Sequence, residues 1–261
     1  MQNFEQLLSA LDLQLFEKIT SQSTEEDKKS FLAVQQAVRE IYPNYNYLEI
    51  GSYLGGSIQP YLLDEQCAKI YSIDKRPPQQ PDERGIDYVY QNNSTARMIE
   101  QLKMVAPEKL GKLETIDGDT RQLQSYRIGV KIQCCFIDGE HTDEAVVSDF
   151  NFCLKVLDEN GIIMFHDAQI TYNGISECVK SLENSGQKFR AYSLPNIVFV
   201  IEIGDFPLHQ NPKILDRLTN NYKSYLDSLQ YNDNYRRFAN RFPFNMMKRF
   251  YVKVRRRNVC E

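Results

Sequence analysis

Residues 45–203 alternate between short apolar runs and amphipathic segments, and this alternation restricts the fold more than any other feature of the chain. Five apolar runs read as strands: YNYLEI, AKIYSID, KLETID, IQCCFID and GIIMFHD. Helical spacing of apolar residues fills 56–65, 94–106, 142–157 and 172–184. Alternating strands and helices favour a parallel sheet covered on both faces. Two further runs, KFRAYSL and NIVFVIEI, are joined by a short proline turn and predict an antiparallel pair at one end of that sheet.

Acidic residues recur at the strand ends. Four of the five strands finish in an acid, and the first carries Glu49 just before its end; the four are Asp74, Asp117, Asp138 and Asp167. In an open parallel sheet, ligands bind in the crevice outside the carboxyl ends of the strands. The sequence therefore predicts that these acids line one rim of the molecule.

The segments on either side of this pattern divide the chain. Residues 4–19 and 24–41 read as helices, the second capped by Ser23 or Thr24. We expect a helical extension over 1–45, an α/β domain over 46–204 and a helical, basic extension over 205–261. The proline-rich stretch 75–85 reads as an exposed loop.

Composition excludes several classes of protein. Of the 261 residues, 42% are hydrophobic and 25% are charged, which is ordinary for a soluble globular chain, and no apolar run is long enough to span a membrane. The N-terminus lacks the basic region of a secretory signal, and the six cysteines form no metal-type pair, so we expect a cytoplasmic location.

The C-terminal segment is unusual in charge. From Arg236 onward there are nine Lys or Arg and a single acid, Glu261, mixed with Phe, Tyr and Met. Such a segment can contact anionic lipid or a phosphorylated carrier, or pack against a second copy in a homo-oligomer. An acidic chain without a recognised reading module is not expected to bind nucleic acid.

A glycine turn follows the first strand. Gly51, Gly55 and Gly56 lie between a strand and a helix, and such glycines let a ligand approach bare backbone. The spacing differs from the dinucleotide fingerprint, and a plain strand–helix turn is an equally good interpretation. Asp74 strengthens the functional interpretation, because an acid at the end of the second strand commonly accepts hydrogen bonds from ribose hydroxyls.

Five motifs in this order carry a family resemblance: LEIGSYLGGS, IYSIDKRP, IDGDT, FIDGEHTDEAVVSDF and NGIIMFHDA. Over Leu48 to Ala168 the chain resembles the class I S-adenosylmethionine-dependent methyltransferases, and within them methyltransferase family 24, which includes macrolide-sugar O-methyltransferases and cephalosporin-hydroxylase-like proteins. The resemblance implies a Rossmann-like fold with a mostly parallel seven-stranded sheet and an antiparallel end hairpin. It also implies S-adenosylmethionine as cofactor and a sugar or glycosylated metabolite as acceptor.

The same resemblance implies cofactor-binding residues. Glu49 and Gly51 correspond to positions beneath the methionine part of the cofactor, and Asp74 to the ribose-binding acid. Gly118 and Asp119 fall in the loop that usually flanks the adenine, although Asp119 or Thr120 can equally serve as a helix cap. Further residues assigned to the cofactor site are Ser52, Gly55, Ser57 and Asp138.

The turn after the fourth strand holds more titratable side chains than a turn needs. Asp138 is followed by His141, and the next strand ends in His166 and Asp167. Two carboxylates at adjacent strand ends repel, and a divalent cation removes that repulsion. The resemblance implies that Asp138 and Asp167 hold Mg²⁺ and that His141, beside Asp138, is the catalytic base. His166 replaces an acid of the relatives and is a candidate third ligand, which favours Mn²⁺ or a softer cation.

Helix capping, without any catalytic role, explains some of the polar residues in this turn. Thr142 is a candidate cap for the following helix, with Asp143 and Glu144 in its first turn. For the whole chain, the alternative to an O-methyltransferase is a non-catalytic cofactor-binding or scaffold protein of a glycan or natural-product pathway.

Overall fold

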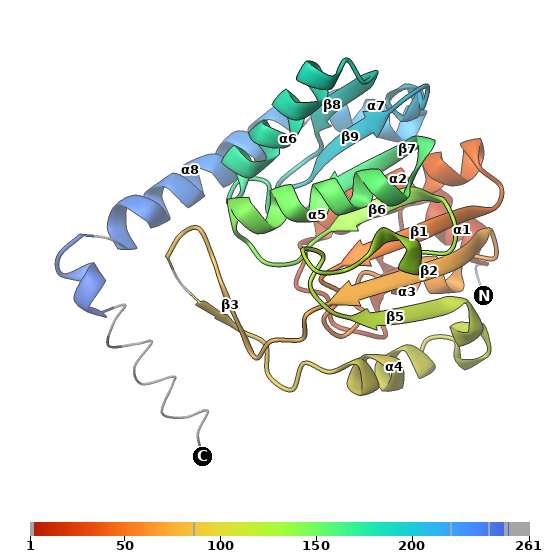
Figure 1. The fold of residues 1–261 in the computed structure, drawn as a ribbon, viewed down its shortest axis with the longest axis horizontal. Coiled ribbons are helices and arrows are strands. Elements are labelled where there is room, and N and C mark those ends of the chain that lie inside the picture. The colour runs from red at the N-terminus through yellow and green to blue at the C-terminus, as the bar shows by residue number, and fades with distance from the viewer. Residues whose placement is uncertain (1–2, 86, 220, 240, 248–249, 251–261) are drawn as a thin grey trace.

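The computed structural model describes residues 3–85, 87–219, 221–239, 241–247 and 250. Its centre is a seven-stranded sheet in the order β5-β2-β1-β6-β7-β9-β8 (Figure 1). The strands are β1 (Tyr45–Ile50), β2 (Cys67–Asp74), β5 (Leu113–Asp117), β6 (Ile132–Ile137), β7 (Leu157–Phe165), β8 (Phe189–Ser193) and β9 (Phe199–Ile203). Neighbours from β5 to β7 pair in parallel, whereas β9 pairs antiparallel with both β7 and β8. The predicted α/β fold with an antiparallel pair at one end of the sheet is confirmed.

Helices cover both faces of the sheet. Along each strand, alternate side chains enter opposite hydrophobic clusters: Tyr47 packs in the cluster with α2, and Leu48 in the cluster with α5. The helices are α1 (Phe4–Ser9), α2 (Glu25–Ile41), α3 (Gln59–Leu63), α4 (Thr95–Lys103), α5 (Asp143–Val156), α6 (Tyr172–Ser185), α7 (Pro212–Thr219) and α8 (Asn221–Ala239). Short 3-10 turns span Leu13–Phe16, Pro107–Lys112, Ser125–Arg127 and Leu208–Gln210.

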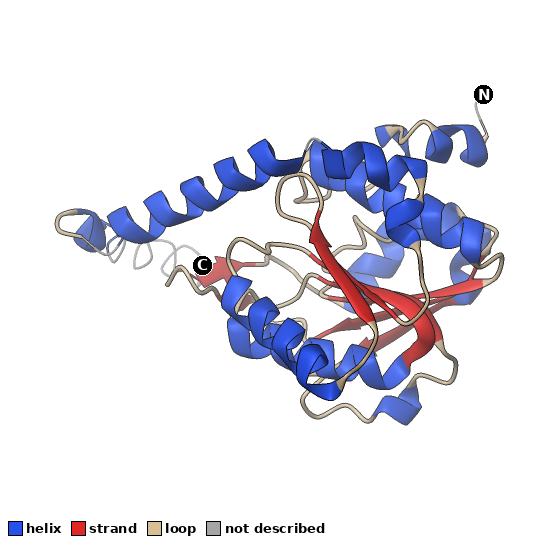
Figure 2. Ribbon diagram, turned by 90° about the horizontal axis from the view of Figure 1, so that it is seen from above, coloured by secondary structure: helices blue, strands red, loops and turns tan. Residues whose placement is uncertain are grey.

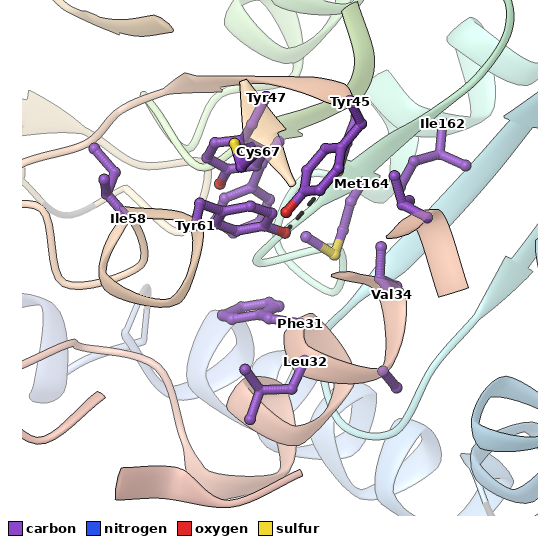
Figure 3. Packing of buried hydrophobic residues seen from close by; sticks show 14 of the residues in the cluster. Phe31, Leu32, Val34, Tyr45, Tyr47, Ile58, Tyr61, Cys67, Ile162 and Met164 are labelled. Atoms are coloured by element: carbon purple, nitrogen blue, oxygen red, sulfur yellow. Dashed lines mark hydrogen bonds between the residues drawn. The ribbon is translucent and has the colours of Figure 1, made fainter. Parts of the chain in front are cut away.

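Aromatic side chains join the N-terminal helices to the sheet. Figure 3 shows Phe31 of α2 beneath the buried tyrosines of β1. The rings of Tyr47 and Tyr61 stack with centroids 3.6 Å apart, and Phe31 lies 4.9 Å from the ring of Phe136 on β6. All four rings are at most 2% exposed, so α2 shares one core with the sheet. The division at residue 45 stays a prediction, because shared packing does not define a domain boundary.

The N-terminal residues only partly follow their predicted helices. Thr24 caps α2 as expected, and its hydroxyl accepts from the backbone N–H of Asp27 at 3.2 Å. The predicted helix over 4–19 is interrupted instead, because Leu11 adopts a positive φ of 53° and the chain continues as a 3-10 turn.

The stretch 75–85 is not the exposed loop that its prolines predict. Residues 79–89 form a hairpin of β3 (Gln79–Pro81) and β4 (Asp87–Val89), which lies to the left of the sheet's strand ends in Figure 1. Gln80, Asp82 and Arg84 are buried. Asp82 pairs with His141 in an isolated bridge, so this hairpin closes over the turn that follows β6.

The C-terminal helix extends away from the body of the molecule (Figures 1 and 2). α8 remains attached where Asn232 donates to the backbone carbonyl of Gln169 at 2.6 Å. Beyond it, Phe242 and Met247 are largely exposed, whereas residues 251–261 lie outside the described residues. Contact of the basic tail with lipid or a carrier therefore stays a prediction. No helix within the described residues is long and apolar enough to cross a membrane.

Candidate functional site

The turn after β1 lies directly against the turn after β6. Gly51 has a φ of +93°, and a Cβ at this position would lie 2.1 Å from the backbone oxygen of Asp138. The backbone N–H of Asp138 in turn donates to the carbonyl of Ile50 at 2.8 Å. Only glycine permits this approach, so the two strand-end turns pack directly against each other.

A buried acid lies one residue before this turn. The Glu49 carboxylate accepts hydrogen bonds from the hydroxyls of Tyr47 at 2.5 Å and Ser57 at 2.8 Å. Burial raises the pKa of Glu49 to about 7, although these hydroxyls oppose the shift. Nearby, the Ser52 hydroxyl accepts from Ser72 at 2.8 Å. Glu49, Ser52 and Ser57 thus form a polar floor next to the glycine turn.

Asp74 ties the glycine turn to the end of β2. Its side chain is nearly fully buried and accepts from the backbone N–H of Tyr53 at 2.9 Å and of Arg76 at 2.7 Å. A carboxylate offers about four acceptor positions, so two such bonds leave capacity for ligand hydroxyls. Gly55 lies in the same loop and has a positive φ of +82°. A Cβ at this position would lie 3.1 Å from the side chain of Leu102.

A first hollow opens between β1, β2 and β5. Its lining includes Gly51, Asp74, Gly118, Asp119 and Thr120. Lys75 spans its mouth, with its ammonium 3.0 Å from carboxylate oxygens of both Asp119 and Glu140. The Arg121 guanidinium, followed by Lys75, holds the pKa of Asp119 below its usual value. The loop residues predicted for the adenine side therefore lie with Gly51 and Asp74 around one hollow.

A second hollow adjoins the first, and Gly51 lines both. Asp138, His141, His166 and Asp167 line it together, so the four residues predicted from adjacent strand ends do meet in space. Its other walls are the tyrosines Tyr53, Tyr88 and Tyr90 and the polar residues 20–24.

The acid pair at the ends of β6 and β7 has a histidine between its members. His166 Nδ1 lies 3.0 Å from Asp138 Oδ1 and 3.0 Å from Asp167 Oδ2. Burial alone would lower the pKa of His166, but the two carboxylates outweigh it and raise the pKa well above its usual value. Ligand atoms of Asp138, His141 and Asp167 also lie within 4.8 Å of one another, a separation that suits a shared cation.

His141 approaches the same pair from the other side. Its Nε2 lies 3.1 Å from Asp167 Oδ2, and its Nδ1 lies 3.4 Å from Asp82 Oδ2. Burial lowers the pKa of His141, yet the carboxylates of Asp167, Asp82 and Asp138 raise it by more, so the net shift is upward. Thr142 caps α5, as predicted, by accepting from the N–H of Ala145 at 3.2 Å.

Two buried acids near the histidines are missing from the predicted site. Asp27 of α2 lies 3.5 Å from His166 Nε2, and Asp82 of the hairpin lies next to His141. Neither follows a strand of the sheet, so the strand-end rule does not reach them. The sequence signal for Asp82 is its closeness to Arg84 in a stretch otherwise read as loop, and for Asp27 it is only a helix-capping position.

Comparison with known proteins shows a likeness in sequence over part of the chain and a likeness in fold. Residues 48–168 match a family model described as a methyltransferase domain. No curated protein sequence matches the chain.

Two solved structures illustrate the likeness of fold. A TDP-rhamnose 3'-O-methyltransferase of calicheamicin biosynthesis has a TM-score of 0.52 and 14% identity, covering 77% of this chain and 94% of its own. An O-methyltransferase of tomaymycin synthesis from Streptomyces achromogenes has a TM-score of 0.50 and 12% identity, covering 76% of this chain and 88% of its own. The segment 48–168 therefore matches a methyltransferase domain by sequence, and the sheet has the same Rossmann-like fold as these two O-methyltransferases.

Asp149, an acid beside the first hollow, leads to a prediction about the stability of the protein. Asp149 is buried, accepts from the Thr120 hydroxyl, and has a pKa raised by burial from 3.8 to about 7. The folded state therefore binds this proton more tightly than the unfolded state. The stability that protonated Asp149 contributes is complete below about pH 4 and is lost as the pH rises through about 7.

We expect Asp149→Asn to raise the free energy of unfolding at about pH 8 by about 2–4 kcal/mol, because three pKa units correspond to about 4 kcal/mol. At about pH 4 the variant and the parent should be equally stable. Urea denaturation at both pH values measures this, with Asp205→Asn, at an exposed side chain, as the matched control. A variant whose stability keeps the parent's dependence on pH would contradict the assignment.

Proposed function

We propose that this S-adenosylmethionine-dependent methyltransferase methylates a hydroxyl group of a sugar or glycosylated small molecule, with the help of a divalent cation. The observation that carries the proposal is the second hollow: a histidine nitrogen and an acid pair face a polar cavity that adjoins the glycine turn. A base, an electrostatic centre and a cofactor loop within one cavity are the parts that methyl transfer to oxygen needs.

The residues proposed for the cofactor fit its parts. Asp74 receives the ribose hydroxyls, Gly118 and Asp119 flank the adenine, and Glu49 with Gly51 lies under the methionine part. Ser52, Gly55 and Ser57 complete the loop and its floor. When bound, S-adenosylmethionine supplies an electrophilic methyl group on a positively charged sulfur. The position of Gly51 supports this assignment, because its backbone packs against Asp138 and lines both hollows.

The walls of the second hollow support a carbohydrate acceptor. Hydroxyl and amide side chains of residues 20–24 offer donors and acceptors, and the rings of Tyr88 and Tyr90 offer apolar faces. A sugar presents both kinds of surface. The TDP-rhamnose enzyme with a similar fold adds support of a general kind only, since at 14% identity the likeness concerns the fold.

The histidines are proposed to differ in role. His166 is buried with Nδ1 between the two carboxylates, which suits a third ligand beside Asp138 and Asp167. His141 lines the hollow, and its Nε2 lies 3.1 Å from Asp167 Oδ2; this position would suit a base that takes the proton from the acceptor hydroxyl. A bound cation would supply positive charge that lowers the pKa of the acceptor hydroxyl. Two carboxylates and an imidazole nitrogen form a donor set that favours Mn²⁺ over Mg²⁺.

The remaining assignments concern the extensions. We assign the catalytic domain to residues 46–204, the N-terminal extension to 1–45 and the C-terminal extension to 205–261. Exposed Tyr222 and Leu226 on α8 support contact of the C-terminal extension with another surface, whether a second copy or anionic lipid. The alternative function, a cofactor-binding or scaffold protein without catalysis, predicts cofactor binding without turnover.

Asp74→Ala tests the cofactor site. Removing a charged acceptor of two ribose hydroxyls loses bonds worth about 1.5–3 kcal/mol each, so affinity for S-adenosylhomocysteine should fall tenfold or more. Calorimetric titration measures the change, and Asp205→Ala, at an exposed position far along the chain, is the matched control. Unchanged affinity in folded Asp74→Ala protein would remove Asp74 from the site.

Chelation tests the cation and separates the histidines. EDTA should abolish methyl transfer but spare S-adenosylhomocysteine binding, and Asp138→Asn or Asp167→Asn should behave like the chelated enzyme. His141→Ala should retain bound metal and lose turnover by about 10²–10⁴-fold, as expected for a general base. Added Mn²⁺ should restore the chelated enzyme better than Mg²⁺.

Metal content by atomic emission distinguishes these cases. Full activity of metal-free protein would end the cation proposal while leaving His141 as a base. Loss of metal from His141→Ala would instead make His141 a ligand.

A further inference from the structure

Large apolar side chains gather beyond the outer end of α8. Among the described residues, thirteen large hydrophobic side chains are exposed, and five of them lie within residues 242–250. Phe242 is 77% exposed, Phe250 71% and Met247 63%. Single exposed hydrophobic residues are common on protein surfaces, whereas a cluster marks a site of contact with another apolar surface. We call Phe242, Met246, Met247 and Phe250 the tail cluster.

The tail cluster is carried away from the catalytic body. α8 is fixed to the body where the Asn221 side chain donates to the carbonyl of Ser193 and the Asn232 side chain donates to that of Gln169. The helix has 19 residues, a length of about 28 Å, and both views show it projecting from the sheet and its helices (Figures 1 and 2). The cluster can therefore meet an extended surface while the body stays in solution.

Local hydrogen bonds give the tail cluster a helical arrangement. The backbone N–H groups of Met246 and Met247 donate to the carbonyl of Pro243 at 3.0 and 3.2 Å. Residues 244–247 and 250 are helical, and the two methionines precede Phe250 by four and three residues. These spacings place side chains on one face of a helix. The apolar side chains are therefore presented together.

Charge accompanies the apolar side chains. Residues 236–261 contain nine of the chain's 31 Lys and Arg but only one of its 35 Asp and Glu. Arg241, next to Phe242, is exposed. The rest of the chain has more acids than bases, so an anionic surface attracts the C-terminal segment and repels the body. Such a surface would meet the C-terminal segment first.

We propose that the tail cluster, with the basic residues around it in the sequence, binds the surface of an anionic lipid bilayer. Segments that lie in the bilayer interface combine apolar side chains, which enter the acyl boundary, with Lys and Arg, which remain at the head groups. A group of Lys and Arg adds attraction to anionic lipids. The tail cluster is separate from both hollows, so this inference does not depend on the proposed methyl transfer.

The apolar residues favour lipid over other partners. Nucleic acid also attracts a basic segment, but its bases are held by flat rings on which they stack, and Met246 and Met247 offer none. A symmetric contact between two copies would bring two basic segments together, which like charge opposes. A bilayer of anionic lipid complements both the charge and the apolar side chains.

Sedimentation with vesicles tests the proposal on the full-length protein, without cofactor or acceptor. We expect the protein to pellet with vesicles of phosphatidylcholine and phosphatidylglycerol in equal parts, and to stay in solution with vesicles of phosphatidylcholine alone. Binding should weaken as sodium chloride is added, because salt screens the attraction between the basic residues and the head groups.

Phe242→Ser combined with Phe250→Ser tests the apolar contribution. The double variant should partition into the mixed vesicles at least about tenfold more weakly, because two rings no longer enter the acyl boundary. Both rings lie at the surface, so the melting temperature should match that of the parent. Tyr126→Ser removes a ring that is 79% exposed on the catalytic body, and this control should bind vesicles like the parent.

Glutamine in place of the three arginines at 255–257 tests the charge contribution. These positions lie outside the described residues. The triple variant should bind mixed vesicles on the order of 100-fold more weakly, since each basic residue near the surface adds to the attraction. Lys188→Gln, which removes one exposed positive charge from the body, is the control and should bind vesicles like the parent.

Three results would overturn the proposal. The first is equal pelleting with both kinds of vesicle, or pelleting that survives loss of the two phenylalanines. The second is binding to single-stranded RNA by a protein that does not bind vesicles, which would make nucleic acid the partner. The third is self-association in analytical ultracentrifugation that the double phenylalanine variant abolishes, without vesicle binding, which would assign the tail cluster to a second copy. Failure of the proposed function, an absence of methyl transfer, would leave vesicle binding unchanged.

Discussion

Two carboxylates that would otherwise repel each other lie at the ends of neighbouring parallel strands, and the rest of the site compensates for their proximity. Pairing of β6 with β7 brings Asp138 and Asp167 to one rim, and the Gly51 turn presses against the backbone of Asp138. His166 Nδ1 lies 3.0 Å from an oxygen of each acid. Such a pair is stable only with positive charge between or beside its members, from imidazolium or from a cation. The same requirement makes the site suitable for polarising a hydroxyl.

The supporting groups come from elements that do not belong to the strand ends. Asp27 reaches His166 from α2, and Asp82 reaches His141 from the β3–β4 hairpin, where Arg84 holds it. Residues 20–24, which like Asp27 lie outside the segment that matches the methyltransferase family model, line the hollow beside the acid pair. In the proposed function, the sheet would provide the cofactor rim, while residues 20–24 and the hairpin would shape the space for an acceptor. Differences in substrate between methyltransferases of this fold are expected to reside in such additions.

The sequence predicts features that depend on neighbouring residues, and it predicts which residues the order of parallel strands brings together. Short apolar runs predict the strands, Thr24 and Thr142 are capping residues as their positions indicate, and parallel strands bring Asp138, His166 and Asp167 to one edge. Contacts between distant segments leave no such pattern. In the sequence, Asp27 falls in the first turn of a predicted helix and Asp82 in a proline-rich loop, because their partners lie far along the chain. The positive φ of Leu11, which interrupts the predicted first helix, likewise has no signal in the sequence, because no glycine marks this position.

Diffraction from crystals grown with S-adenosylhomocysteine and Mn²⁺ tests the central claim most directly, because anomalous scattering locates manganese independently of any assay. The account predicts an anomalous peak within ligand distance of Asp138 and Asp167, with S-adenosylhomocysteine extending from Asp74 across Gly51 and its sulfur turned toward His141. A fully occupied cofactor with no anomalous peak at the acid pair would contradict the claim that these carboxylates form a cation site. A cofactor bound elsewhere would contradict the assignment of the rim itself.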